Sequence, residues 1–208
     1  MKTEYVAASP SSPLQVSLRR AQIDDRPQIY RWLAHSDATA EMLGAPTFPD
    51  GPIPTWEQHS ADFSIEEFYQ PGPPQDSHVD WGECWIICVE NREDASHHEV
   101  GQINFSDMRA PSDPASEGLA ELDIWIGARQ WWGRGIGTQA IEALGHVLRG
   151  YGVTTLLIRP SARNQRAVAA YKRAGFIEAT SQTHRLPAKV YEPEDWDYAD
   201  AVVLVKTL

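Results

Sequence analysis

Three glycines at alternate positions separate a segment with the apolar pattern of a strand from a segment with the apolar pattern of a helix. Gly133, Gly135 and Gly137 follow a segment of alternating apolar residues and precede a segment with apolar residues at helical spacing. Glycine lets the backbone take positive φ and approach a ligand without side-chain interference. The helix that follows points free N–H groups and the positive end of its dipole at this loop. The loop therefore either binds an anion or is a glycine-rich turn that begins a helix.

The loop differs from the two commoner phosphate-binding loops. It lacks the Gly-Lys-Ser/Thr ending of a P-loop and the glycine spacing of a dinucleotide-binding fold. A second segment favours anion binding, since Asn164, Ala167 and Tyr171 fall along one predicted helix just before Gly175-Phe176. Asn164 and Tyr171 lie about two helical turns apart and therefore face the same side. The alternative is a helix cap at Asn164 and a tyrosine at the edge of the core.

The remaining pattern predicts a mixed α/β sheet in one domain. Strands are expected over 14–19, 81–90, 99–107, 119–127, 154–158, near 176 and over 202–205; helices over 24–35, from 56 to about 68 with Thr55 as N-cap, over 138–148 and over 166–174. The strands over 81–90 and 99–107 form a hairpin joined by the turn 91–98. Residues 1–12 are expected to be a loose arm, and residues 13–208 a single domain.

Charge and composition narrow the class of partner. Lysine and arginine total 18 against 29 aspartates and glutamates, which gives a net charge of −11. This sign argues against nucleic acid as the main partner and is compatible with a cationic substrate, although it also keeps a protein soluble. No apolar run approaches the roughly 20 residues that cross a bilayer, so no membrane association and a cytoplasmic location are expected.

Cysteine and histidine spacing predicts neither a disulfide nor a metal site. Cys84 and Cys88 lie on one face of a predicted strand. Four strand steps span roughly 13 Å, beyond the ~7 Å Cα limit for a disulfide, so both are expected to be free, buried thiols. His97-His98 is the only close pair among seven histidines, and no spacing resembles a metal site.

Two blocks of the sequence resemble the GNAT superfamily of N-acetyltransferases, and the resemblance covers most of the chain, from Leu18 to Phe176. The first block is Gln130-Trp131-Trp132-Gly133-Arg134-Gly135-Ile136-Gly137, and the second runs from Arg159-Pro160-Ser161-Ala162-Arg163-Asn164 through Ala167 and Tyr171 to Gly175-Phe176. The opening Leu18-Arg19-Arg20 with Ile29-Tyr30-Arg31-Trp32-Leu33 looks like the aminoglycoside 6'-acetyltransferases and the ribosomal-protein acetyltransferases. The fold implied is a GNAT-like, mainly antiparallel mixed sheet flanked by helices and splayed at the cofactor-binding strand.

The resemblance also implies an acetyl-coenzyme A site and its residues. The pyrophosphate would be held by the loop of Trp132, Gly133, Arg134, Gly135, Ile136, Gly137 and Thr138, and the pantetheine arm would pair with the backbone of Trp125, Ile126 and Gly127. Asn164 and Ala167 would contact the cofactor, and Tyr171 would protonate the departing thiolate. One departure matters, because Arg159-Pro160 stands where the aminoglycoside enzymes tend to have Asp-Pro, which argues against a polycationic substrate.

Acetyl transfer requires a neutral amine, so the site must help to remove a proton. An alkylamine with a pKa near ~10 is only about 0.1% deprotonated at pH 7, a deficit of roughly 4 kcal/mol. Asp123 is the first candidate to accept the proton, with a structural carboxylate as the alternative, and Glu121 is expected to be a solvated strand residue. A backbone N–H around Trp125 or Ile126 could stabilise the oxyanion. Trp131 and Trp132 either border the substrate mouth or, as we expect, pack against neighbouring side chains of the loop.

The favoured function is acetylation of a small-molecule amine, with an aminoglycoside-like substrate and hence antibiotic resistance as the first hypothesis. A protein N-terminal or lysine acetyltransferase and a non-catalytic acetyl-CoA-binding module remain alternatives. The oligomeric state is expected to be a monomer or a homodimer.

Overall fold

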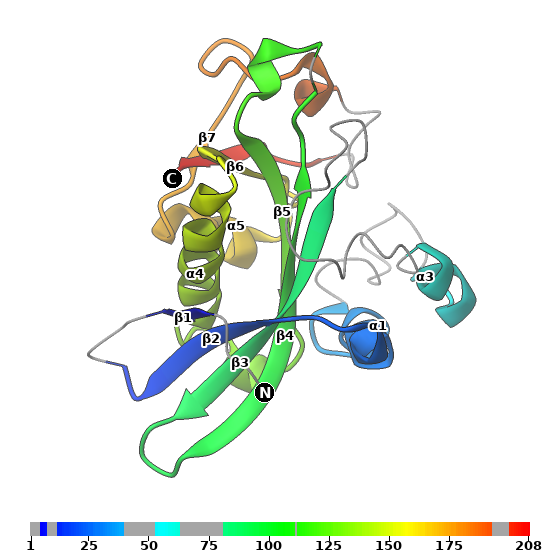
Figure 1. The fold of residues 1–208 in the computed structure, drawn as a ribbon, viewed down its shortest axis with the longest axis vertical. Coiled ribbons are helices and arrows are strands. Elements are labelled where there is room, and N and C mark those ends of the chain that lie inside the picture. The colour runs from blue at the N-terminus through cyan, green and yellow to red at the C-terminus, as the bar shows by residue number, and fades with distance from the viewer. Residues whose placement is uncertain (1–4, 8–11, 40–52, 63–80, 111, 193–199) are drawn as a thin grey trace.

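The computed structural model describes residues 5–7, 12–39, 53–62, 81–110, 112–192 and 200–208, which form one eight-stranded sheet with helices on both faces (Figure 1). The strand order is β1-β2-β3-β4-β5-β6-β8-β7. The strands are β1 (Tyr5–Ala7), β2 (Leu14–Arg20), β3 (Gly82–Asn91), β4 (Ser96–Asp107), β5 (Leu119–Ile126), β6 (Thr155–Ile158), β7 (Ile177–Glu178) and β8 (Leu204–Thr207). The helices are α1 (Arg26–Ala34), α3 (Trp56–Asp62), α4 (Ile136–Gly150) and α5 (Gln165–Arg173), with short 3-10 turns at Ile23–Asp25, Pro114–Ser116, Arg129–Trp131 and Ala188–Tyr191.

The sheet is splayed between β5 and β6, which are the one parallel pair among the strands of the described residues. All other neighbouring strands are antiparallel. The β5–β6 ladder covers only residues 119–121 of β5, so residues 122–126 extend beyond their partner. The expected mixed, mainly antiparallel sheet with a splay at this strand is therefore confirmed, and one edge of β5 is left open.

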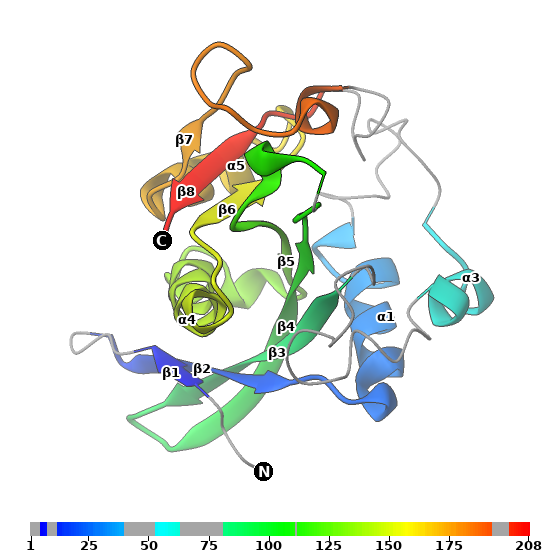
Figure 2. The ribbon, with the colours of Figure 1, turned by 45° about the horizontal axis from the view of Figure 1, so that its top comes forward.

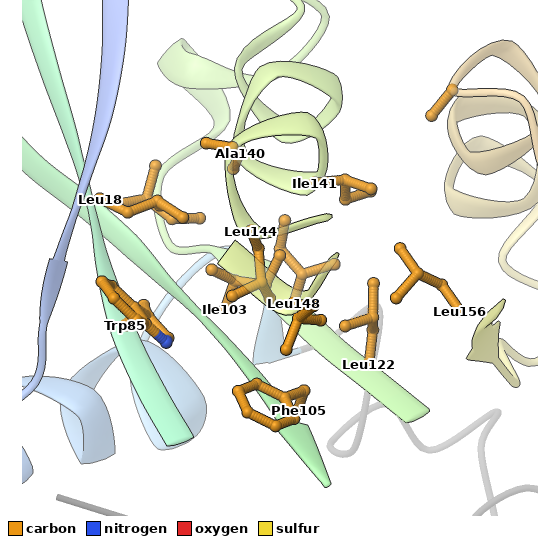
Figure 3. Packing of buried hydrophobic residues seen from close by; sticks show 14 of the residues in the cluster. Leu18, Trp85, Ile103, Phe105, Leu122, Ala140, Ile141, Leu144, Leu148 and Leu156 are labelled. Atoms are coloured by element: carbon orange, nitrogen blue, oxygen red, sulfur yellow. The ribbon is translucent and has the colours of Figure 1, made fainter. Parts of the chain in front are cut away.

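The main core lies between α4 and the sheet. Its α4 stripe consists of Ala140, Ile141, Leu144 and Leu148, whose spacing places them on one helix face. Figure 3 shows these side chains gathered against Leu18, Trp85, Ile103, Phe105, Leu122 and Leu156 from five strands. This packing fixes where α4 begins, and therefore where its N-terminus points.

Helix α1 lies on the face of the sheet opposite α4 (Figure 2). A second apolar cluster lies between α1 and this face. Ile29, Trp32 and Leu33 of α1 pack there against Cys84, Ile86, Cys88 and Trp125. Both cysteines are buried and free, as predicted, and burial raises the pKa of the Cys88 thiol to about 11. They are packing residues and not reactive thiols.

A β-bulge in β4 brings the backbone of β5 close to Gly101. Ile87 is opposite Gly101 while Cys88 is opposite Glu99, so Val100 is the extra residue. A Cβ on Gly101 would clash with the carbonyl oxygen of Trp125, which explains why glycine occupies this position. The bulge therefore shapes the end of β5 that borders the splay.

Most predicted elements are confirmed, with differences at their ends. The hairpin turn is shorter than expected, because Asn91 and Ser96 already pair. Thr55 caps α3 as predicted: its Oγ1 accepts from the Gln58 N–H at 3.2 Å, and Gln58 Oε1 accepts from the Thr55 N–H at 2.8 Å. The expected continuation of this helix to residue 68 lies outside the described residues.

The expectation of a loose arm over residues 1–12 is corrected at residues 5–7. They form β1, which pairs antiparallel with β2 in the register Tyr5↔Leu18 and Ala7↔Val16. Such pairing satisfies backbone groups of β2 that would otherwise form an open sheet edge. None of the helices in the described residues is both long and apolar enough to span a bilayer.

Candidate active site

A cleft of about 1220 Å³ lies at the splay of the sheet. It extends from the N-terminus of α4, past β5 and α5, to Leu33 of α1 and His59 of α3. It is lined by every residue predicted for catalysis or cofactor binding except Gly127: Asp123, Trp125, Ile126, Trp132, Gly133, Arg134, Gly135, Ile136, Gly137, Thr138, Asn164, Ala167 and Tyr171. Segments far apart in the sequence therefore meet in one hollow.

The glycine loop gives α4 an N-terminus that is open to the cleft. Gly133 and Gly135 have φ of +70° and +77°, and Gly135 is the N-cap of α4. The first helical bond runs from the Gln139 N–H to the Gly135 carbonyl at 3.0 Å, so the three preceding N–H groups, of residues 136–138, have no helical acceptor. No acidic residue stands in the first turn. This arrangement suits an anion.

Arginine side chains add positive charge beside these N–H groups. The Arg166 guanidinium lies 3.8 Å from the centre of the Trp132 ring, and that of Arg134 lies 5.6 Å from the centre of the Trp131 ring. A Cβ at Gly133 would meet no atom of the described residues within 4 Å apart from its chain neighbours, so among these residues the loop is open on that side. The residues present therefore fit a diphosphate group.

The open edge of β5 carries the backbone groups of Ile124 and Ile126. The Gly127 N–H donates to the Val100 carbonyl of β4 at 2.9 Å, and the Trp125 carbonyl also faces β4. Because backbone groups alternate between the two edges of a strand, those of Ile124 and Ile126 face the splay. Trp125, Ile126 and Gly127 are the residues whose backbone the family resemblance pairs with the pantetheine arm, and Ile126 is the one among them whose backbone groups this alternation directs to the splay.

Trp132 joins the glycine loop to this edge. Its indole N–H donates to the Ile126 carbonyl at 2.7 Å. Trp132 also packs against the cluster under α1, while Trp131 packs against the main core. Both tryptophans line the cleft as well. The two roles that the sequence left as alternatives for these tryptophans, packing and bordering the cleft, therefore occur together.

Asp123 and Tyr171 both line the cleft and lie near enough to each other to interact electrostatically. Asp123 is exposed on β5, and Tyr171 is partly buried on α5. Burial, and then the negative charge of Asp123, raise the pKa of Tyr171 above its usual 10, while Arg166 acts in the opposite direction. In the described part of the chain the Tyr171 hydroxyl has no hydrogen-bond partner. The phenol therefore stays protonated at neutral pH and can donate to a ligand.

Glu121 holds Arg159, which corrects the expectation of a solvated glutamate. Arg159 Nε donates to Glu121 Oε1 at 2.6 Å, and a terminal nitrogen donates to Oε2 at 2.9 Å. The two side chains are 20% and 13% exposed. In the parallel register Glu121 lies opposite Leu157. Arg159, which directly follows β6, therefore lies beside Glu121. The arginine that departs from the aminoglycoside pattern is thus neutralised within the cleft.

Asn164 caps α5 and also lines the cleft. Its Oδ1 accepts from the Ala167 N–H at 3.1 Å. The preceding loop is held by Asp200, which accepts from the Ser161 hydroxyl at 2.9 Å and from Arg163 Nε at 2.9 Å. The helix cap proposed as an alternative is therefore real, and it does not exclude a contact with a ligand.

Several residues that line the cleft were not predicted from the sequence, among them Asn104, Ser106, His59 and Arg173. One signal was available, because Gln102, Asn104 and Ser106 alternate with Ile103 and Phe105 along β4. Polar residues on the face opposite the core mark a surface that something else covers. Among the described residues, no group of three or more His, Cys, Asp or Glu side chains could hold a metal ion.

Several solved structures share this fold. A domain from Methanocaldococcus jannaschii matches with a TM-score of 0.63 and 17% identity, over 94% of this chain and 99% of that one. The aminoglycoside acetyltransferase AAC(6')-Ib in complex with coenzyme A matches with a TM-score of 0.62 and 21% identity, over 92% and 94%. RimJ of Mycobacterium smegmatis matches with a TM-score of 0.58 and 15% identity, over 99% and 86%.

The family itself is established by sequence. No curated protein gives a significant match. The family model described as acetyltransferase (GNAT) domain, however, matches residues 15–177, which include the splayed strand, the glycine loop and α5. Its acetyl donor is acetyl-CoA. The chain therefore belongs to the GNAT acetyltransferase family and is an acetyl-CoA-dependent acyltransferase.

Proposed function

We propose that this acetyltransferase acetylates a primary amine of a small molecule, with the reacting nitrogen beside Asp123. The observation that carries the proposal is the position of Asp123 on the splayed strand, in the same cleft as Tyr171 and the glycine loop. A carboxylate at this point attracts an ammonium group and accepts its proton, directly or through water.

The donor half of the cleft provides the contacts that acetyl-CoA needs. The N–H groups at the start of α4, with Arg134, would hold its diphosphate. The open edge at Ile124 and Ile126 would pair with its pantetheine arm, while Asn164 and Ala167 would line its path. When bound, acetyl-CoA supplies a thioester whose carbonyl carbon is the electrophile.

The other groups of the site act on protons and developing charge. Asp123 lowers the cost of deprotonating the amine, which amounts to roughly 4 kcal/mol at pH 7 for an amine of pKa ~10. The Ile126 N–H faces the splay and would donate to the carbonyl oxygen as negative charge grows on it. Tyr171, kept protonated by its raised pKa, would donate its proton to the sulfur of the departing coenzyme A thiolate.

The charge of the cleft bears on the choice of amine. AAC(6')-Ib, a structural neighbour, has been solved with kanamycin, and aminoglycosides are therefore the first small molecules to test here. Arg159 nevertheless offsets the charge of Glu121, which leaves the acceptor side less negative than a polycation requires. Amines with fewer charges belong in the same panel, as do peptides with a free N-terminus.

The decisive experiment measures thiol release from acetyl-CoA with each acceptor. A thermal shift with acetyl-CoA first establishes that the donor binds. We expect thiol release with at least one small amine, and a large loss of release in Asp123→Asn. Release with peptides alone would replace the small-molecule acceptor with a protein, and binding of acetyl-CoA without release for any acceptor would disprove the proposal.

A further inference from the structure

Two side chains in the wall of the cleft have hydrogen-bonding groups that the described residues leave unused. Asn104 of β4 and Trp125 of β5 both line the cleft, and they are 8% and 5% exposed. Among the described residues, neither Asn104 Oδ1 nor Trp125 Nε1 has a hydrogen-bond partner. Buried polar groups in native proteins are nearly always paired, because losing water without replacing its hydrogen bond is unfavourable. One unused acceptor and one unused donor thus indicate a ligand that supplies both partners.

The side chain across the strand pair does not supply them. Gln102 is directly opposite Trp125 in the register and is fully buried. Its Oε1 accepts from the Cys84 thiol at 3.0 Å, so the amide oxygen opposite the indole is already engaged. Gln102 Nε2 is also unused, although Gln102 lies outside the lining of the cleft. A structural pairing of Gln102 with Asn104 is therefore the account that an experiment must separate from ligand binding.

The spacing of the two groups favours a carboxamide over a hydroxyl as their common partner. Asn104 is opposite Asp123, so Trp125, two residues further along β5, is its diagonal neighbour on the same face. Diagonal neighbours in an antiparallel pair are about 7–8 Å apart. One hydroxyl oxygen bonded to both groups would span at most about 6 Å, given hydrogen bonds of about 3 Å. A carboxamide has its acceptor oxygen and its N–H donors on separate atoms, so it suits a wider spacing.

We propose that the acceptor amine carries a carboxamide next to the reacting nitrogen. The amide oxygen accepts from the Trp125 indole N–H, and an amide N–H donates to Asn104 Oδ1. The inference rests on the proposed function, which puts the reacting nitrogen beside Asp123, and it defines the substrate class. Asn104 and Trp125 are then substrate-binding residues, and the carboxamide is unchanged by the reaction.

Matched amines isolate the contribution of the carboxamide. Glycinamide and isobutylamine have the same arrangement of heavy atoms, with the carboxamide of the first replaced by an isopropyl group in the second. After correction for the fraction of neutral amine at the assay pH, wild type should use glycinamide with a kcat/KM about tenfold higher or more. Asn104→Leu and Trp125→Phe each remove one hydrogen-bonding group. Each should lower the ratio of glycinamide to isobutylamine kcat/KM about tenfold, with the KM for acetyl-CoA unchanged.

Two further variants control for shape and for general damage. Asn104→Asp keeps an acceptor oxygen at similar volume and should keep the preference for glycinamide. Asn91→Ala, an asparagine change at the hairpin end of β3 and outside the lining of the cleft, should behave as wild type.

The outcomes separate failure of the inference from failure of the proposed function. Equal use of the two amines by wild type after the correction, or an unchanged ratio in either folded variant, would overturn the inference. An unchanged ratio with lowered stability in Asn104→Leu would assign Asn104 to a structural pairing with Gln102. If neither variant folds, the wild-type ratio decides alone.

Two more measurements test the source of the carboxamide and cover an inactive enzyme. If wild type releases no thiol, calorimetric binding of the two amines to the coenzyme A complex gives the same ratio. Binding of glycinamide that is no tighter than that of isobutylamine would then overturn the inference. A decapeptide with an N-terminal glycine carries the same amine and amide. Its use in preference to glycinamide would keep the carboxamide contacts and replace the small-molecule acceptor of the proposed function with a peptide.

Discussion

The carboxylate of Asp123 is the proposed proton acceptor for the amine, and its removal gives the first prediction. Asp123→Asn keeps the shape of the side chain and loses the ability to accept a proton, so kcat should fall by roughly 10²–10⁴. The thermal shift with acetyl-CoA should persist, because the glycine loop is unchanged. Asp24→Asn, at an exposed aspartate outside the cleft, is the control. Equal kcat in the two variants would assign Asp123 a structural role.

The hydroxyl of Tyr171 gives a prediction about pH. Burial and the charge of Asp123 raise its pKa above 10, so the protonated, donating form is present throughout the neutral and mildly alkaline range. The neutral fraction of an amine with a pKa near ~10 grows over the same range. For wild type, kcat/KM should therefore rise from pH 7 toward pH 10, with no falling limb caused by Tyr171.

The matched variant is Tyr171→Phe, which should lower kcat at every pH without changing the shape of the profile. The measurement is initial rate of thiol release against pH at low acceptor concentration. A wild-type decline at pH 8–9 that disappears in Tyr171→Phe would show that the tyrosine titrates there, contrary to the raised pKa.

At the scale of single residues, the sequence predicted which residues line the cleft better than it predicted the hydrogen-bond and ion-pair partners of their side chains. Asp123 and Tyr171 were identified from strand alternation and from resemblance to a family, and both line the cleft. The pair of Glu121 with Arg159 was not predicted, because it depends on how two parallel strands are aligned across 38 residues of chain. Hydrophobic periodicity specifies which face a side chain occupies and says nothing of that alignment.

Among the elements, the start of α4 depends on a backbone conformation that favours glycine. Gly135 has a φ of +77°, and a Cβ there would meet only Gln139 Nε2, at 3.8 Å, so strain rather than crowding opposes substitution. Gly135→Ala should destabilise the protein by about 1 kcal/mol, since left-handed backbone costs an L-residue roughly 1–2 kcal/mol. It should also weaken coenzyme A binding, because the N–H groups of residues 136–138 would shift.

Gly150→Ala is the matched control at the other end of the same helix. An added Cβ there meets no atom within 4 Å, and the backbone does not have positive φ. This change should be neutral or stabilise by up to about 1 kcal/mol, because alanine reduces the freedom of the unfolded chain. Urea unfolding measures both variants, and equal free energies of unfolding would show that the loop tolerates a side chain.

Helices and strands were predictable where a local sequence pattern specifies them. They were less predictable where pairing with a strand distant in the sequence specifies them. The amphipathic stripe of α4 and the alternation of β5 were read correctly from their periods. Strand β1 was missed because three residues carry too short a pattern and form a strand only by pairing with β2. The direction of the Gly127 N–H, which donates to the Val100 carbonyl, was not predicted, because it depends on the register of β5 with β4.

Over the whole molecule, charge is distributed unevenly. The chain has a net charge of −11, yet four arginines line the cleft (Arg134, Arg159, Arg166 and Arg173) against three carboxylates (Glu121, Asp123 and Glu142). An acidic protein repels a polyanion at long range, so we expect binding of coenzyme A to depend on this local excess of positive charge and on the N-terminus of α4. The arginines and the helix N-terminus both attract an anion electrostatically, and dissolved ions screen this attraction.

The last prediction therefore concerns ligand, salt and stability together. A ligand that binds only the folded state at 100 times its Kd stabilises by about 2.7 kcal/mol, and for a chain of this size 1 kcal/mol shifts the Tm by roughly 2–4 °C. Coenzyme A should accordingly raise the Tm by roughly 5–11 °C, and the shift should shrink as NaCl is raised from about 50 to 500 mM. Pantetheine, which lacks the diphosphate, should give a smaller shift that salt barely changes. An equal, salt-independent shift with both ligands would mean that the glycine loop does not hold the diphosphate, and that the strand edge alone binds the donor.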